Sequence, residues 1–162
     1  MTEIVARPLS AEAFAPFGDV LDAAGAPDMV INRGLCGRYH DRAKLDVEGC
    51  LGISVFDARA RQLPYDLDMV ERHPLGSQAF LPMQAEPFLV VVAPDEDGVP
   101  GTPAAFLAAP GQGVNYLRGT WHGVLTPLST PGLFAVIDRV GGREDLNLEE
   151  YFFSAPHRIV LP

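Results

Sequence analysis

Cysteine is scarce in this sequence, because its 162 residues include only Cys36 and Cys50. Neither belongs to a Cys-x-x-Cys pair or to the spacing of a Cys/His metal site, so we expect reduced thiols and no disulfide framework. Long apolar runs are also lacking. The longest, residues 88–93, is too short to cross a bilayer, and the first residues lack the basic start and apolar stretch of a signal peptide. We therefore expect a cytoplasmic protein.

Cationic residues are few as well. Lys and Arg number 12 against 21 Asp and Glu, which gives a formal net charge of -9. A surface of that sign repels phosphate backbones and anionic lipid headgroups. We therefore expect that neither a nucleic acid nor a membrane surface is a partner of this protein.

Turn-forming residues are abundant, since the sequence holds 16 glycines and 15 prolines without a repeating period. With 48% hydrophobic residues the chain can bury a core, and its length suits one domain over residues 1–162. Apolar stretches separated by glycine or proline predict strands at 51–58, 67–73, 78–81, 88–93, 104–108, 113–117, 121–125 and 133–140. This pattern is typical of an antiparallel sandwich or barrel.

Segments outside these strands carry signals of their own. Ser10 before a run of helix formers predicts a short helix that Pro16 ends. Residues 32–46 are polar and contain two glycines, which predicts a loop or an edge strand. The acidic run 95–98 predicts a solvated hairpin turn. Residues 147–150 predict a last helical turn before a proline-containing tail.

A polar pair follows the apolar start of the strand predicted at 67–73. Because side chains alternate along a strand, one face carries Leu67, Met69, Glu71 and His73. A face that begins with leucine and methionine is the buried one, and a buried carboxylate needs a compensating partner. Gln78 begins the next predicted strand, so the turn between the strands brings a further polar group to the same place.

A second polar cluster spans residues 111–122 and ends on His122. The two patterns, Glu-x-His-x4-Gln and Gly-x5-Leu-x-Gly-x2-His, resemble the cupin motifs His-x-His-x4-Glu and Gly-x5-Pro-x-Gly-x2-His. The positions that match the four cupin metal ligands are Glu71, His73, Gln78 and His122. The spacing agrees with the motifs, whereas Glu71 and Gln78 differ from them in residue type.

A more specific resemblance runs through nearly the whole chain. It is carried by Arg38-Tyr39-His40-Asp41, Glu71-Arg72-His73-Pro74-Leu75-Gly76-Ser77-Gln78-Ala79-Phe80, Gln112-Gly113-Val114-Asn115-Tyr116, Trp121-His122 and Ile137-Asp138-Arg139. These stretches resemble the ureidoglycolate lyase family, formerly called ureidoglycolate hydrolase. Two positions depart from the family pattern, which has histidine where this chain has Leu117 and Gly123.

The resemblance implies a mainly β protein, a cupin-type antiparallel β-barrel (double-stranded β-helix) with short flanking helices. It also implies an enzyme, usually a homodimer, whose small-molecule substrate is ureidoglycolate. This carbon–nitrogen lyase would split ureidoglycolate into glyoxylate and urea in allantoin and purine nitrogen breakdown. One base for the hydroxyl proton and one acid for the leaving urea nitrogen suffice for this reaction.

Glu71, His73 and His122 are the candidate catalytic residues under this resemblance. We expect Glu71 or His73 as the base and His122 as the acid. Two imidazoles and a carboxylate suit a divalent metal such as Ni, Mn, Fe or Zn, with Gln78 as a weak fourth ligand. An acid–base pocket without metal is the alternative.

The substrate carboxylate needs a local cation in so acidic a protein. Arg118 is the preferred clamp because it lies in the turn before His122, and Arg72 and Arg139 are the other candidates. Because side chains alternate strictly along a strand, Arg72 is expected to face away from Glu71. The candidates for contact with the ureido group are Gln78, Asn115 and Tyr116. Of the neighbours Asn115 and Tyr116, only one can face inward.

Other functions stay open from the sequence. An amidohydrolase would cut the ureido amide and release ammonia. A nonhaem iron oxygenase would use the same two histidines and carboxylate. A non-catalytic cupin would bind small carboxylic acids without turnover. Residues 32–41 are expected to form either a lid at the barrel mouth or a dimer contact.

Overall fold

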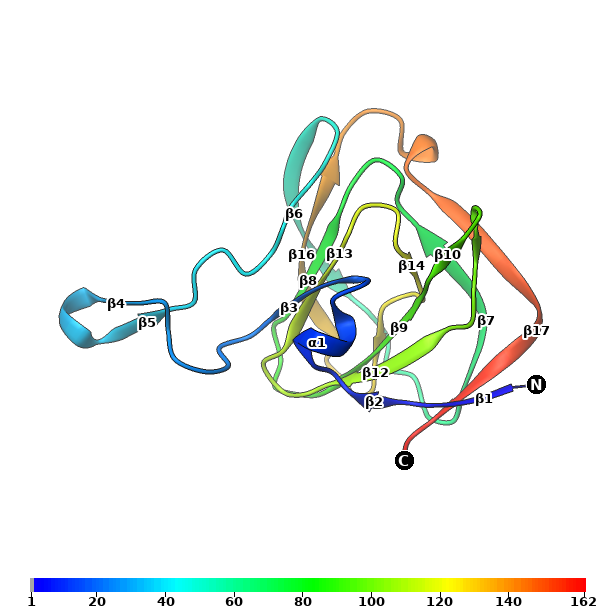
Figure 1. Cartoon of the computed structure of the whole chain (residues 1–162), viewed down its shortest axis with the longest axis horizontal. Helices are drawn as coiled ribbons and strands as arrows, with labels where there is room; N and C mark the ends of the chain where they lie inside the picture. The colour runs from blue at the N-terminus through cyan, green and yellow to red at the C-terminus, as the bar shows by residue number, and fades with distance from the viewer. Residues whose placement is uncertain (1) are drawn as a thin grey trace.

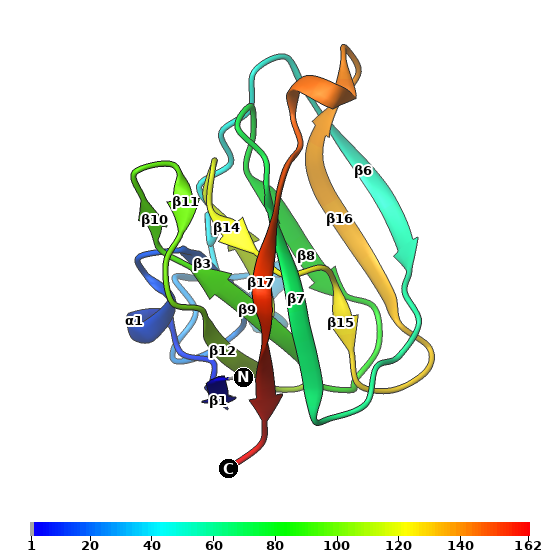
Figure 2. The same cartoon turned by 90° about the vertical axis from the view of Figure 1, so that its right-hand side faces the viewer.

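The larger of the two main β-sheets curls into a nearly closed barrel wall. The computed structural model describes residues 2–162. The strand order is β1-β17-β7-β14-β9-β12-β2, with β15 beside β9. The bounds are β1 (Thr2–Val5), β17 (Glu149–Val160), β7 (Tyr65–Arg72), β14 (Trp121–His122), β9 (Phe88–Ala93), β12 (Ala104–Ala108), β2 (Arg7–Pro8) and β15 (Thr126–Pro127). Figure 2 shows β17 beside β7.

The smaller sheet completes the barrel from the opposite side (Figure 1). Its five antiparallel strands have the order β3-β13-β8-β16-β6. The bounds are β3 (Gly18–Leu21), β13 (Gly113–Tyr116), β8 (Gln78–Pro82), β16 (Leu133–Val140) and β6 (Cys50–Asp57). The mainly β, cupin-type barrel expected from the sequence is confirmed.

Helices are short. The described residues form α1 (Ala11–Phe14) and the 3-10 turns η1 (Asn32–Gly34) and η2 (Glu144–Leu146). None of the helices within residues 2–162 has the length and apolarity needed to cross a membrane. The hydroxyl of Ser10 accepts a hydrogen bond from the backbone N of Ala13, so α1 begins at the predicted cap.

One apolar core fills the space between the two sheets, and a second lies behind β9. The β9 side chains in the first core are Phe88, Val90 and Val92, and those in the second are Leu89, Val91 and Ala93. Both faces of β9 are therefore buried, which explains why its sequence is an unbroken apolar run. The predicted strands at 88–93 and 133–140 coincide with β9 and β16.

The acidic run 95–98 forms the expected hairpin turn. β10 (Asp95–Glu96) pairs with β11 (Val99–Pro100). Asp97 and Gly98 between them have φ of 55° and 89°. A tight hairpin turn with positive φ at both central residues favours an Asp-Gly pair.

The prediction for the C-terminal end is wrong. The helical turn η2 comes before the expected 147–150, and the supposed tail is β17, a strand of 12 residues. Pro156 suggested a tail, but it lies within a register shift of β17 against β7, between Phe152 and His157. A proline is tolerated there because its missing N–H donor is not needed at a bulge, where the ladder of hydrogen bonds is interrupted. The short strands β1, β2 and β3 were also not predicted.

The same register shift changes how β7 presents its side chains. Leu67 and Val70, three positions apart, both pack in the second core, whereas Glu71 lies opposite His122. The expectation that Leu67 shares a face with Glu71 is therefore wrong. Alternation breaks where β17 carries extra residues opposite β7, between the pairs of Leu67 and Met69.

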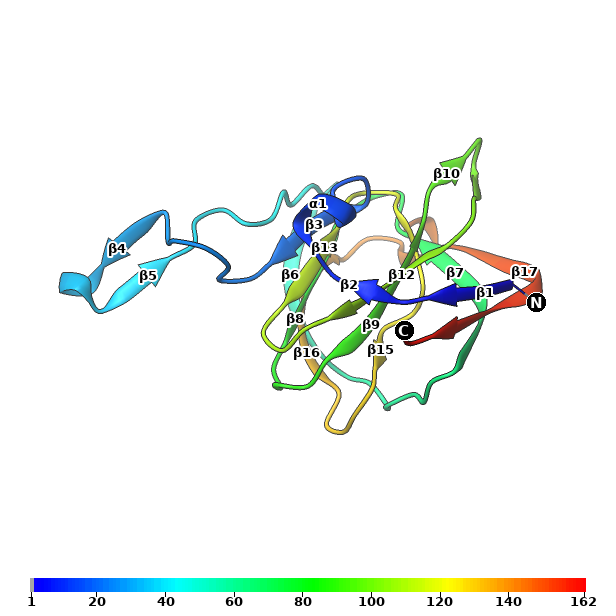
Figure 3. The ribbon, with the colours of Figure 1, turned by 60° about the horizontal axis from the view of Figure 1, so that its bottom comes forward.

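A hairpin projects away from the barrel, as Figures 1 and 3 show. It consists of β4 (Met29–Ile31), η1 and β5 (Cys36–Arg38), and the two strands pair only with each other. Every residue from 28 to 38 is exposed. This segment is the polar stretch expected as a loop or edge strand, and it does not cover the barrel as a lid.

Candidate active site

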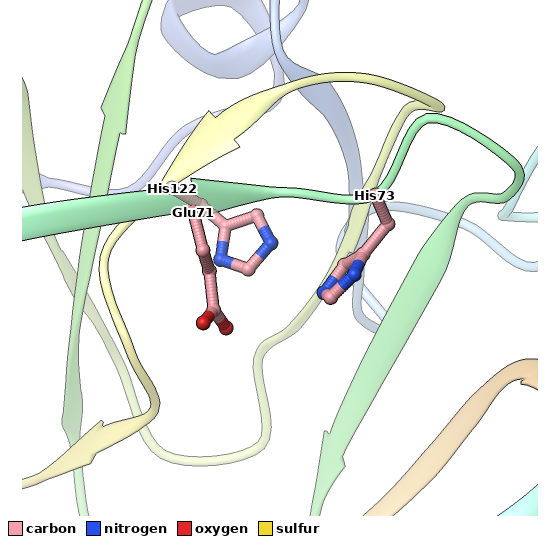
Figure 4. A group of neighbouring side chains, drawn as sticks. All are labelled: Glu71, His73 and His122. Atoms are coloured by element: carbon pink, nitrogen blue, oxygen red, sulfur yellow. The ribbon is translucent and has the colours of Figure 1, made fainter. Parts of the chain in front are cut away.

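Glu71, His73 and His122 converge between the two sheets (Figure 4). Glu71 lies near the end of β7, His73 follows that strand, and His122 ends β14. β14 pairs with β7 so that His122 stands directly opposite Glu71. The ligand atoms of the three side chains lie within 4.8 Å of one another. The convergence expected from the two motifs is therefore present.

Both histidines are oriented by backbone carbonyls. His73 Nδ1 lies 2.8 Å from the carbonyl oxygen of Asn147, and His122 Nδ1 lies 3.1 Å from that of Gly123. A carbonyl can only accept, so each Nδ1 carries the proton. Each Nε2 is then a lone-pair donor, and both Nε2 atoms are buried without a hydrogen-bond partner.

Gln78 adds a third unpaired acceptor. Its side-chain Nε2 donates to Asp138 Oδ2 at 3.0 Å, which fixes the direction of the amide. The amide oxygen is buried and has no hydrogen-bond partner. Asp138 therefore positions Gln78 so that its oxygen, and not its nitrogen, is available as a ligand.

The donor set fits a divalent cation. Two imidazole nitrogens and one carboxylate converge, and buried acceptors without donors are costly unless a cation or another donor satisfies them. Imidazole nitrogens oriented by a hydrogen bond at Nδ1 are the usual state of metal-bound histidine. The residues present thus match the chemistry of a metal site in their type and orientation.

Burial controls the proton affinities of the site. Burial, together with the proximity of His73, lowers the pKa of His122 from 6.5 to about 3. Burial raises the pKa of Glu71, against the lowering effect of His73 and with a small rise from Glu150. His122 is therefore neutral at pH 7, and Glu71 holds a proton more readily than an ordinary glutamate.

A cavity of about 460 Å³ opens beside His73. Its lining residues are Ser54, Phe56, His73, Asp138, Arg139, Val140, Gly141, Glu144, Asn147 and Leu148. Glu71 and His122 are not among these lining residues, and the ring of His122 is almost completely buried. His73 is therefore the member of the cluster that borders the cavity.

Residues 46–48 brace the turn that separates His73 from Gln78. Their backbone exchanges hydrogen bonds of 2.7 and 2.8 Å with Ser77 and Leu75. These hydrogen bonds fix the position of the turn. They therefore also fix the position of His73, which follows a strand of the larger sheet, relative to Gln78, which begins a strand of the smaller sheet.

The structure places Arg118 and Arg72 outside the cavity. Arg118 Nε donates to the carbonyl of Pro74 at 2.6 Å, and its guanidinium pairs with Glu48. Arg72 pairs with Asp95 and Glu149 at 2.7 and 2.5 Å, and faces away from Glu71 as alternation predicted.

Arg139 is the arginine that lines the cavity. Its Nε donates to the carbonyl of Glu48 at 2.7 Å. Among the side chains that the structure describes, no carboxylate forms an ion pair with this guanidinium. It is therefore the arginine best placed to meet an anion in the cavity.

Only one of the neighbours Asn115 and Tyr116 faces inward. Tyr116 stacks on His122, with ring centroids 4.3 Å apart and an interplanar angle of 1°. Burial raises the pKa of the Tyr116 phenol. Asn115 points the other way and donates to Asp19 and to the carbonyl of Lys44, so the structure does not bring it to the site.

Asn147 is the functional residue that sequence reasoning missed. Its carbonyl orients His73, and its side-chain oxygen accepts a hydrogen bond from the backbone N of Leu75 at 2.8 Å. No local pattern signals this role, because the contact joins residues 74 positions apart. For Asp138, the only indication in the sequence of a role at the site was its place in one of the stretches that resemble the family.

The two departures from the family pattern do not remove a ligand from this cluster. A Cβ added at Gly123 would meet Leu67 and Val91 at 3.3 Å, which belong to the second core. Leu117 lines a hollow with Arg118 and Trp121, separate from the cavity beside His73.

Comparison with known proteins gives this arrangement a family. A sequence profile described as ureidoglycolate lyase matches residues 1–160. The chain belongs to the ureidoglycolate lyase family. Ureidoglycolate lyase of Rhodobacter capsulatus is 61% identical over 158 residues, covering 96% of this chain and 97% of the relative. Ureidoglycolate lyase of Chelativorans sp. is 52% identical over 165 aligned residues, covering 100% of this chain and 99% of the relative. Ureidoglycolate lyase 2 of Rhizobium meliloti is 50% identical over 162, covering 98% of each.

Proposed function

We propose that this protein is a carbon–nitrogen lyase that splits ureidoglycolate into glyoxylate and urea. The observation that carries the proposal is the convergence of Glu71, His73 and His122 in a chain of the ureidoglycolate lyase family. We further propose that it acts in the cytoplasm, as a homodimer, in allantoin and purine nitrogen breakdown. Two free cysteines, both exposed, are compatible with a reducing compartment.

The reaction is the collapse of a carbinolamide. Ureidoglycolate carries a hydroxyl and a ureido nitrogen on one carbon, next to a carboxylate. When the hydroxyl loses its proton, the C–O bond becomes the carbonyl of glyoxylate and the C–N bond breaks. Its electron pair stays on the urea nitrogen, which takes up a proton. Neither water nor an oxidant is consumed, so one group that accepts and returns a proton is sufficient.

Glu71 is the residue we assign to this proton transfer. Its carboxylate lies within 4.8 Å of both histidine rings, where it can take a proton from the hydroxyl and return it to the urea nitrogen as that group leaves. The acid role expected for His122 is disfavoured because its lowered pKa and its Nδ1 contact leave a neutral ring that presents a lone pair.

The site would hold a divalent cation through His73, His122 and one oxygen of Glu71, with the amide oxygen of Gln78 as a further ligand. Such a cation acts as a Lewis acid that stabilises negative charge on a substrate oxygen. The second oxygen of the Glu71 carboxylate remains available for the proton. Asp138 and Asn147 orient Gln78 and His73 for this work.

The products distinguish the lyase from its alternatives. Purified protein with ureidoglycolate should release urea and glyoxylate in equal amounts, measured by coupled assays, with no requirement for O2. Ammonia as the main nitrogen product would instead identify an amidohydrolase. An O2 requirement would indicate an oxygenase, and tight binding of glyoxylate without turnover would indicate a non-catalytic cupin.

The carboxylate of the substrate is expected to bind Arg139 rather than Arg118. Arg139 lines the cavity, whereas the guanidinium of Arg118 is engaged by Glu48 and Pro74. Arg139→Ala should raise KM roughly tenfold, the loss expected for one charge-assisted hydrogen-bonded contact. Arg139→Lys should keep part of the affinity, because lysine supplies charge without the bidentate geometry.

Arg118→Ala is the matched comparison, and inhibition by oxalate is the second readout. Oxalate shares the carboxylate but lacks the ureido group, so its inhibition constant should rise with KM in Arg139→Ala. If Arg118→Ala weakens oxalate inhibition and Arg139→Ala does not, the clamp is Arg118, as the sequence first suggested.

A further inference from the structure

The cavity beside His73 contains polar groups that the reaction centre does not use. The polar residues of its lining are Ser54, His73, Asp138, Arg139, Glu144 and Asn147. His73 and Asn147 contact each other, and Arg139 is assigned to the substrate carboxylate. The hydroxyl and the two carboxylates among the other lining residues have no ligand assigned to them.

Asp138 has one carboxylate oxygen engaged and the other without a partner. Its Oδ2 accepts the hydrogen bond from Gln78 Nε2 at 3.0 Å, which fixes the direction of the side chain. Within the described part of the chain, nothing donates a hydrogen bond to its Oδ1. The residue is half-buried and lines the cavity. Oδ1 is thus an acceptor available to a molecule that enters beside His73.

Ser54 lies on the neighbouring strand and faces the same side of the sheet. β16 pairs with β6 so that Val136 stands opposite Ser54 and Asp138 stands opposite Gly52 (Figure 2). Residues two apart on a strand share a face, so Ser54 is the diagonal neighbour of Asp138, roughly 7–8 Å away. Among the described residues, no partner contacts its hydroxyl. A small polar group therefore fits between the two side chains.

The ureido end of ureidoglycolate is rich in hydrogen-bond donors. It carries one N–H on the nitrogen that leaves and two on the terminal nitrogen, against a single carbonyl oxygen. Two of these N–H bonds point in parallel, as in a guanidinium group, and such a fork suits a carboxylate. The third N–H points away from the fork and needs an acceptor of its own, such as a hydroxyl.

We propose that Asp138 and Ser54 recognise the ureido end of the substrate. Asp138 Oδ1 accepts from the parallel N–H groups, and the Ser54 hydroxyl accepts from the third. Arg139 binds the carboxylate at the other end, so each end of the substrate meets a group of complementary charge. The choice of ligand rests on the proposed function, and the inference makes Asp138 and Ser54 the residues that determine specificity for a ureido group.

Glu144 lines the same cavity but suits this role less well. It belongs to the 3-10 turn η2 and is exposed. An exposed carboxylate is well hydrated, so exchanging its water for a ligand N–H gains little free energy. Asp138 is half-buried and held by Gln78, which makes its contact stronger and better directed. Glu144 is therefore the matched control for Asp138.

The test is the binding of two stable analogues, measured by calorimetry on the full chain. N-carbamoylglycine keeps the carboxylate and the ureido group, whereas N-acetylglycine has a methyl group in place of the terminal NH2. The wild-type protein should bind N-carbamoylglycine at least about tenfold more tightly, because the methyl group leaves both acceptors without a donor. Asp138→Ala should reduce this preference to about threefold or less, and Ser54→Ala should lower it about threefold. Glu144→Gln should leave it unchanged.

Ser54→Ala separates recognition from the placement of Gln78, because it leaves the contact between Gln78 and Asp138 intact. Equal binding of the two analogues by the wild-type protein, or no binding of N-carbamoylglycine at millimolar concentration, would overturn the proposal. So would a preference that survives unchanged in Ser54→Ala and Asp138→Ala, or one that Glu144→Gln alone removes.

The result does not depend on lyase activity, because neither analogue carries a hydroxyl on its α-carbon and neither can be cleaved. A protein with the expected preferences that releases no urea from ureidoglycolate would keep this inference and lose the proposed activity. A protein that releases urea but binds both analogues equally would keep the activity and lose the inference.

Discussion

His73→Ala and His122→Ala should each lower kcat for ureidoglycolate cleavage by about 100-fold or more. Both rings present a buried Nε2 toward the same point, within 4.8 Å of the Glu71 carboxylate. Loss of either ring removes a neutral ligand or hydrogen-bond acceptor that no other described side chain of the cluster replaces. Initial rates of glyoxylate formation at saturating substrate give the comparison.

His157→Ala is the control for this pair. His157 belongs to β17 and lies outside the cluster, so its removal should leave kcat within threefold of the wild-type value. The thermal unfolding temperatures of the three variants distinguish a loss of catalysis from a loss of folding stability. If His73→Ala and His122→Ala keep activity within threefold of wild type, both residues have a structural role and no role in catalysis.

Removal of divalent metal should lower kcat by about 100-fold, and addition of Mn, Ni or Zn should restore it. The reason is that a Lewis acid contributes several kcal/mol to stabilising charge on a substrate oxygen. The measurement combines activity before and after chelation with metal content by mass spectrometry. One equivalent of metal per chain is expected in the active protein.

Asp138→Asn tests the same site without touching a ligand. Asparagine at position 138 can pair with either the nitrogen or the oxygen of the Gln78 side chain. The Gln78 amide can then turn over, and the site loses a fixed oxygen ligand. The metal dissociation constant should rise by about tenfold or more. Full activity in protein that contains almost no metal would instead support the acid–base pocket without a cation.

Local patterns predicted the half of the site that comes from adjacent strands. Glu71 and His73 share a face by alternation, and Gln78 follows one turn later, so a short segment of sequence contains their geometry. His122 could be added only through the motif resemblance, because 49 residues separate it from His73. Its pairing opposite Glu71 depends on the assembled sheet.

Long-range contacts account for what the sequence did not predict. The turn position of Arg118 suggested that it lies near the site, but its direction is set by Glu48, which is 70 residues away along the chain. The contact of His73 with Asn147 likewise requires that β17 pair with β7. Neither interaction leaves a periodic signal, since each depends on where two distant segments meet.

The position of β17 has a consequence for how the protein is made. Among the described strands β17 is synthesised last, and it lies between β1 and β7, which carries Glu71. Until it emerges, β7 has only the two-residue strand β14 as a neighbour. Pairings between distant segments form slowly. The nascent chain therefore carries the residues of the site before β17 completes the sheet that positions them.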